Sequence, residues 1–265
     1  MKTLKIAAAL AACLIGGVAS ADTIYDSLDT SAPNLPSLGY QATQTAEFGD
    51  RVSFAGTARG LDTVTVELSS WALASTWGSQ SDSYTHALTL NLYGAGTGAL
   101  PGALIATQTI DATIPFRPEA SAGCDGGGWM ASNGACYNGM AFTVTFDFAS
   151  LGVTLPDSVV FGLAFNTETW GAAPTGVDGP YDSLNFALSS GATIGTDVNP
   201  DGVFWNTATQ GNLTSGTAGV FGEDTAWSPY VPAVQFTASD VPEPASIALV
   251  GLALAGMGIA RRRKA

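Results

Sequence analysis

Oxygen-bearing side chains alternate along one short stretch, residues 197–202, and these residue types can hold a cation. The stretch contains three candidate calcium ligands and a glycine: Asp197, Asn199, Asp201 and Gly202. Such oxygens converge on Ca²⁺ when the glycine permits a sharp turn. The position for a bidentate glutamate holds Ala208, so another acid would have to complete the site, with Asp178 and Asp182 as candidate donors. Because Asn-Pro-Asp-Gly also fits a type I turn, calcium, the one candidate cofactor, and a plain turn both remain open.

Tryptophans lie in or beside the turn-rich stretches of the chain. The four candidates for stacking on sugar rings are Trp129, Trp170, Trp205 and Trp227. An exposed indole beside Asp and Asn side chains suits a sugar, whose ring has apolar faces and whose hydroxyls need polar partners. The alternative is that these side chains fill the ends of a sandwich, where a buried tryptophan removes a large apolar area from water.

The sequence lacks the motifs of the common hydrolases. It contains no Gly-x-Ser-x-Gly elbow and no His-Glu-x-x-His pair. The single histidine, His86, alternates with Leu88 and Leu90, so we expect a core or rim residue and not a catalytic base. Two carboxylates about 5–9.5 Å apart could hydrolyse a glycoside, but in so acidic a chain some pair meets that distance by chance. We therefore predict no enzymatic activity and no catalytic residues.

The charge of residues 22–240 is strongly negative. This segment has three cations, Arg51, Arg59 and Arg117, against 21 acids, and it contains no lysine, which leaves a net charge of −18. A surface of this sign repels phosphate backbones, so we predict that nucleic acid is not a partner. It suits solubility outside the cell and attracts divalent cations.

Two cysteines fall in the same segment, Cys124 and Cys136. In an oxidising compartment we expect them to pair, and closing the intervening loop would stabilise the fold by about 3 kcal/mol in the chain-entropy model. A metal site is the alternative, but the sequence offers no second Cys or His cluster to complete one.

Apolar residues recur at every second position in several segments, which is the period of a half-buried strand. The alternating sets are Val64, Val66 and Leu68; His86, Leu88, Leu90 and Leu92; Met140, Phe142, Val144, Phe146 and Phe148; Val159, Phe161, Leu163 and Phe165; and Val234 and Phe236. Gly, Pro, Asn and Asp cluster between them, as turns require. The pattern predicts that residues 22–240 form one all-β domain, an antiparallel, jelly-roll-like β-sandwich, with 22–39 as a lead-in that pairs at a sheet edge.

The N-terminus has the pattern of an export signal. Lys2 and Lys5 precede an apolar run over residues 6–18, and small residues at 19–21 provide a cleavage site. We predict a signal peptide over 1–21. The competing reading is a lipoprotein box ending at Cys13, which would leave only about seven apolar residues before the cut, at the lower edge of a working apolar region.

The C-terminus ends in an apolar run and a basic cluster. Residues 245–260 are apolar or glycine apart from Ser246, and residues 261–264 follow as Arg261, Arg262, Arg263 and Lys264. As a helix this run reaches about 24 Å, so it predicts a short single transmembrane segment. The positive-inside rule places the basic cluster in the cytoplasm and the rest of the chain outside.

The tripeptide Pro242, Glu243 and Pro244, the apolar run and the basic cluster occur in this order at the extreme C-terminus. This arrangement resembles the PEP-CTERM sorting signal of Gram-negative bacteria, over about 25 residues within 241–265. The resemblance implies transient insertion in the inner membrane, recognition by an exosortase, cleavage near 242–244 and transfer to the cell surface, usually in exopolysaccharide producers. The alternative is an ordinary C-terminal anchor.

Two internal segments are similar to secreted bacterial sandwich modules. Residues 92–94 with 100–106 resemble a hairpin of such modules, and residues 47–50, 55–57 and 64–66 resemble their opening strands. The likeness supports the fold and the location without adding chemistry. We therefore predict an exported, acidic, non-enzymatic protein of the cell surface or the exopolysaccharide matrix. A carbohydrate-binding module that retains matrix polysaccharide is the alternative, and a glycoside-active enzyme is the third reading.

Overall fold

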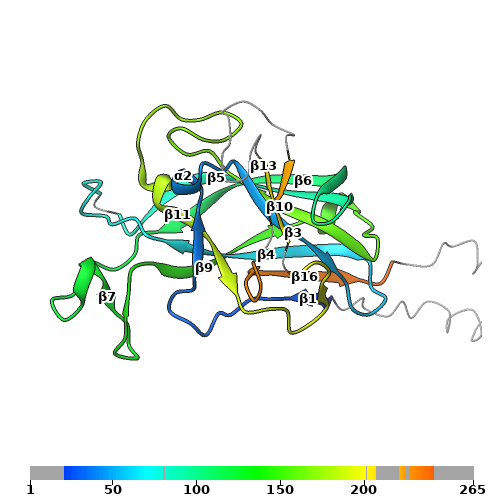
Figure 1. Cartoon of the computed structure of the whole chain (residues 1–265), viewed down its shortest axis with the longest axis horizontal. Helices are drawn as coiled ribbons and strands as arrows, with labels where there is room; N and C mark the ends of the chain where they lie inside the picture. Colours follow the sequence, from blue (N-terminus) through cyan, green and yellow to red (C-terminus); the bar gives the residue numbers. More distant parts are fainter. Residues whose placement is uncertain (1–20, 80, 201, 207–220, 225–226, 242–265) are drawn as a thin grey trace, which may run out of the picture.

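The computed structural model describes residues 21–79, 81–200, 202–206, 221–224 and 227–241 (Figure 1). The predicted signal peptide and the predicted segment at 245–260 fall outside these residues, apart from Ala21. Within the part of the chain described, no helix is long and apolar enough to cross a membrane.

Eight strands form two antiparallel sheets that pack face to face. One sheet has the order β1, β16, β4, β9, with bounds Asp22–Asp26, Val234–Ser239, Gly60–Ser70 and Met140–Asp147. The other has the order β3, β10, β5, β6, with bounds Glu47–Ser53, Ser158–Ala164, Ser83–Ala95 and Pro101–Pro115. Counted along the chain, these strands lie in the orders 1-8-3-6 and 2-7-4-5, which is the arrangement of a jelly roll. The predicted fold class is confirmed.

Shorter elements extend both sheets. In the first sheet, β11 (Leu184–Ser189) pairs with the end of β4, on the same side of β4 as β16. It also pairs with β2 (Ser37–Gly39) and β15 (Val231–Pro232). Beside β3, the second sheet gains β12 (Thr196–Asp197), β13 (Val203–Asn206) and β14 (Phe221–Asp224). In the described ranges, four short helices connect strands: α2 (Tyr40–Thr43), η2 (Asp125–Gly127), η3 (Ala149–Leu151) and η4 (Pro180–Ser183).

The core lies between the sheets and follows the period of two in the sequence. The residues of the predicted inward faces that are fully buried include Val64, Val66, Leu68, Leu88, Leu90, Leu92, Phe146, Phe161 and Leu163. Phe236 of β16 meets Phe161 of the opposite sheet, with ring centroids 5.8 Å apart. The predicted alternation is therefore confirmed, since residues two apart on a strand share a face.

A disulfide joins Cys124 and Cys136, as predicted. It closes the segment that carries β7 (Trp129–Met130) and β8 (Cys136–Tyr137), a hairpin separate from the two large sheets. The hairpin projects beyond the sandwich (Figure 1).

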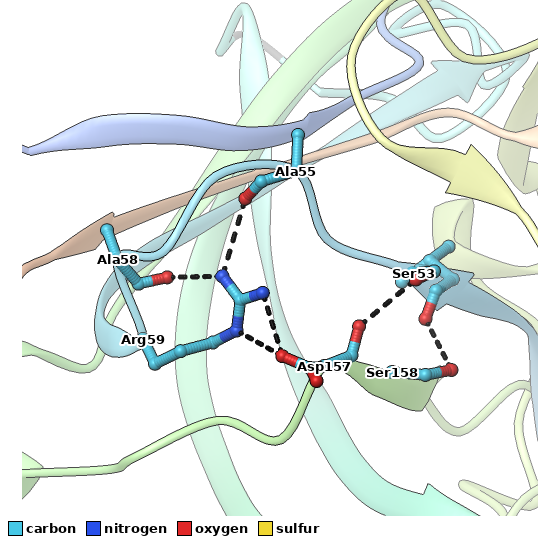
Figure 2. Close-up of polar contacts among 7 residues, drawn as sticks. Ser53, Ala55, Ala58, Arg59, Asp157 and Ser158 are labelled. Atoms are coloured by element: carbon cyan, nitrogen blue, oxygen red, sulfur yellow. Dashed lines mark hydrogen bonds and ion pairs between the residues drawn. The ribbon is translucent and has the colours of Figure 1, made fainter.

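One ion pair lies within 4 Å among the described residues, between Arg59 and Asp157. Figure 2 shows the Arg59 guanidinium between the Asp157 carboxylate and the carbonyl oxygens of Ala55 and Ala58. The contacts tie the connection between β3 and β4 to the turn before β10. Because the Asp157 side chain is 91% exposed, the pair contributes less than about 1 kcal/mol.

Candidate functional site

A cleft of about 580 Å³ opens where β2, α2, η4 and β11 meet, and its size is within the usual range for ligand sites. Two tryptophans, Trp71 and Trp227, line it together with polar side chains from the surrounding elements. The remaining lining residues are Ser37, Leu38, Gly39, Ala42, Thr43, Asp182, Ser183, Asn185 and Leu188. The cleft thus combines aromatic surface with a few convergent polar groups.

Trp71 follows directly after β4 and is held by its backbone and by its indole edge. Its backbone N–H donates to the Ser183 carbonyl at 2.9 Å, and its own carbonyl accepts from Arg117 Nε at 3.3 Å. The indole Nε1 donates to Ser69 Oγ at 3.0 Å. The residue is nevertheless 40% exposed. Because the N–H edge is already bonded, the exposed part offers apolar ring surface to a ligand.

Trp227 anchors the other aromatic side of the cleft. Its ring lies 5.3 Å from that of Phe48, a fully buried residue of β3, and the side chain is half-buried. One part of the indole therefore packs on the core while the rest lines the cleft. This packing fixes the ring in place.

The polar wall comes from η4 and the start of β11. Asp182 lies within η4, and its carboxylate accepts hydrogen bonds from the backbone N–H groups of Glu168 (2.7 Å) and Gly179 (3.1 Å). In the amide orientation that satisfies its neighbours, Asn185 accepts from Ser37 Oγ at 3.0 Å and from Trp71 Nε1 at 3.3 Å. The Ser183 hydroxyl makes no hydrogen bond within the described structure. Spare acceptor and donor capacity therefore faces the space beside the two tryptophans.

Of the four tryptophans proposed from the sequence, the structure places Trp227 in the cleft. Trp129 is half-buried on the disulfide hairpin, where its Nε1 donates to the Gly139 carbonyl at 2.8 Å. Trp170 is half-buried, with its backbone bonded to Thr167. The side chain of Trp205 lies outside the described part of the chain.

Sequence reasoning missed Trp71. The signal that could have found it is local: the apolar alternation of residues 64–68 ends in Ser69 and Ser70, and a tryptophan follows at once. A large aromatic residue placed directly after a strand end lies at the rim of a sandwich, not in its core. Only the three-dimensional structure brings it next to Asn185.

His86 of β5 lies partly buried beside η4 and the segment before it. The side chain is half-buried, its Nε2 lies 2.6 Å from the Asn166 carbonyl oxygen, and its ring stacks on Tyr181 with centroids 4.7 Å apart. Burial lowers the pKa of His86, although the Asn166 carbonyl and Asp182 oppose the shift. Its near contacts are thus a backbone carbonyl and aromatic rings.

Of the candidate calcium ligands, Asp197 ends β12, Asn199 begins a tight turn, and Asp201 lies outside the described residues. Asp197 Oδ1 accepts the Asn199 N–H at 2.9 Å, and the Gly202 N–H donates to the Asn199 carbonyl at 2.7 Å, the bond of a β-turn. The Asn199 side chain donates to Glu223 Oε1 at 2.8 Å. No group of three or more His, Cys, Asp or Glu residues in the described ranges is placed to hold a metal. Calcium binding here stays a prediction that would need Asp201.

Melting the protein in calcium, magnesium or sodium at matched ionic strength tests that prediction. A specific site would stabilise the folded state by about 2.7 kcal/mol at a hundredfold excess of Ca²⁺ over Kd, and Asp201→Ala should abolish the preference for calcium. Diffuse screening of the negative surface would act equally in all salts of the same ionic strength. Coincident melting curves in the three salts would reject a specific site.

The fold and the composition define the class of this protein: an acidic, disulfide-containing jelly roll. A scan against protein families matches residues 240–264 to the PEP-CTERM protein-sorting motif. The chain therefore carries the signal of an exported, exosortase-processed protein of the cell surface or extracellular space, as the sequence predicts. Neither the curated proteins nor the solved structures contain a significant match to the chain.

Proposed function

We propose that the mature protein is a non-enzymatic component of the cell surface or of the exopolysaccharide matrix. The observation that carries the proposal is the sorting motif at residues 240–264, which directs the chain to the outside of the cell. The acidic domain suits that location, since its net charge favours solubility in an extracellular medium.

The chemistry of the cleft favours binding over catalysis. Asp182 is the one acid among its lining residues, and both of its carboxylate oxygens already accept backbone N–H groups. Glycoside hydrolysis uses two carboxyl groups that flank the bond to be broken. A single, hydrogen-bonded carboxylate is better suited to holding a hydroxyl group.

Cell fractionation with mass spectrometry tests the proposed location and processing. We expect the surface or released form to lack residues 261–264, because cleavage near Pro242, Glu243 and Pro244 removes everything beyond it. Replacing these three residues by alanine should leave the chain uncut in the membrane fraction, whereas Thr237→Ala, just upstream, serves as the control. Full-length protein in the cytoplasm would reject the proposal, and an intact C-terminus on surface protein would favour a plain anchor.

The second candidate function, carbohydrate binding, is favoured by the cleft itself. Two tryptophans and hydroxyl, amide and carboxylate groups line one continuous space. This is the combination that a sugar requires, with ring surface for its apolar faces and hydrogen-bonding groups for its hydroxyls. Such a site would retain polysaccharide at the place to which the sorting motif delivers the protein.

A further inference from the structure

We infer that the cleft binds an uncharged polysaccharide chain, with the exposed ring of Trp71 as its stacking surface. The inference rests on the proposed carbohydrate-binding function and specifies its site and the class of ligand.

Trp71 is available to a ligand. It is 40% exposed, whereas Phe48, Phe161 and Phe236 are fully buried. Aromatic side chains at binding surfaces supply large apolar area with few rotatable bonds, so ordering them on binding costs little entropy.

Trp71 is also supported from behind by the disulfide hairpin. Arg117 donates to the Trp71 carbonyl through Nε and to the Gly127 carbonyl through Nη2 at 3.0 Å. Gly139, whose carbonyl accepts from Trp129, packs so closely against the Trp71 indole that a Cβ at this position would overlap it. The hairpin thus holds the ring before a ligand arrives, and a site held in its binding geometry loses less free energy on binding.

The polar wall beside Trp71 matches hydroxyl groups. Asp182 offers carboxylate lone pairs, Ser183 a hydroxyl and Asn185 an amide group whose nitrogen also donates to the Leu184 carbonyl, and all three residues line the cleft. Sugar hydroxyls both donate and accept hydrogen bonds, so they can pair with all three.

The charge of the domain selects among polysaccharides. Residues 22–240 carry a net charge of −18, and the lining of the cleft contains an acid but no arginine, lysine or histidine. Chains of uronic acids would therefore be repelled, whereas neutral glucans and mannans would not. The occupant that fits is a neutral hexose polymer.

Affinity electrophoresis and calorimetry of the full chain test the inference. The chain is kept in a zwitterionic detergent without a sugar headgroup, and the probes are a soluble β-glucan, a galactomannan and alginate, each with and without calcium. We expect the chain to bind at least one neutral polymer. Trp71→Ala should lower the affinity for this polymer about tenfold or more. Trp71→Phe, which keeps a stacking ring, should lower the affinity less than about threefold. Leu104→Ala, at an exposed apolar residue of β6 outside the cleft, should bind as the unmodified chain does.

A second variant keeps the test valid if Trp71→Ala fails to fold. Ala42→Arg places a long side chain at the exposed rim of the cleft without removing a contact. It should lower the affinity for a neutral polymer about fivefold or more, because the added side chain fills space in the cleft. An acidic polymer would instead bind more tightly, because it is attracted to the added cation. Binding of a neutral polymer that neither variant changes would overturn the cleft as the site and leave carbohydrate binding standing. Binding of alginate alone would overturn the neutral ligand, and no binding to any probe would overturn both the inference and the carbohydrate-binding function.

Discussion

Phe236→Ala is expected to lower the free energy of unfolding by about 3–5 kcal/mol, the usual cost of removing a large aromatic side chain from a core. Phe236 is fully buried, and its ring lies 5.2 Å from Phe54, 5.8 Å from Phe161 and 6.3 Å from Tyr25. These partners come from β1, β10 and the end of β3, so one side chain joins both sheets. Its removal leaves a cavity where the two layers meet.

Thermal unfolding followed by circular dichroism measures the effect. We expect a fall in Tm on the order of 10 °C for a domain of this size. Leu151→Ala is the matched control, because Leu151 is 53% exposed on η3 and its truncation should change stability by less than about 0.5 kcal/mol. A Phe236→Ala protein as stable as the control would show that Phe236 does not join the sheets as described.

A second large effect is expected at Asp50, an acid that faces the core. Asp50 is 1% exposed, and on β3 it shares a face with Val52. Asp197 of β12 pairs directly with Val52, so the two carboxyl groups are diagonal neighbours on one face of the sheet. Arg51, the adjacent cation, points to the other face, where it donates to Ser158 Oγ and the Gly98 carbonyl.

Burial raises the pKa of Asp50 well above its usual value, and the negative charge of Asp197 adds to this shift. The Arg51 N–H, which donates to Asp50 Oδ1, opposes it. The folded state therefore binds a proton more tightly than the unfolded chain. It follows that the stability contributed by the protonated group is fully present below the ordinary pKa of an aspartate, about 4. This stability is lost as the pH rises from there through the folded-state pKa.

Asp50→Asn should remove this loss, because the amide keeps an oxygen for the Arg51 N–H, carries no charge and can donate to Asp197. We expect the variant to match the unmodified protein near pH 4 and to exceed it by about 1–3 kcal/mol at pH 7, the cost of burying a polar group without full compensation. Denaturant unfolding across this pH range measures the difference. Asp111→Asn, at an exposed acid of β6, is the control. We expect its unfolding free energy, relative to that of the unmodified protein, not to increase from pH 4 to pH 7 as that of Asp50→Asn does. An Asp50→Asn protein less stable than the unmodified one at pH 7 would contradict the prediction.

The route of export and the layers of the fold could be predicted from the sequence, because both depend on signals that lie close together in the chain. The sorting motif consists of consecutive residues, and the core faces follow from a period of two within single strands, such as residues 64–68. The Cys124–Cys136 pair is also a local feature, since few residues separate the two.

The cleft and the proximity of Asp50 and Asp197 were decided only by the tertiary structure. Trp71, Asn185 and Trp227 are far apart in the sequence and meet because β11 takes the place of β16 along one side of β4. Likewise, Asp50 and Asp197 become neighbours through the register of β12 on β3. The pairing of distant strands depends on the packing of the whole sandwich, and a shift of one residue would turn Asp197 to the opposite face.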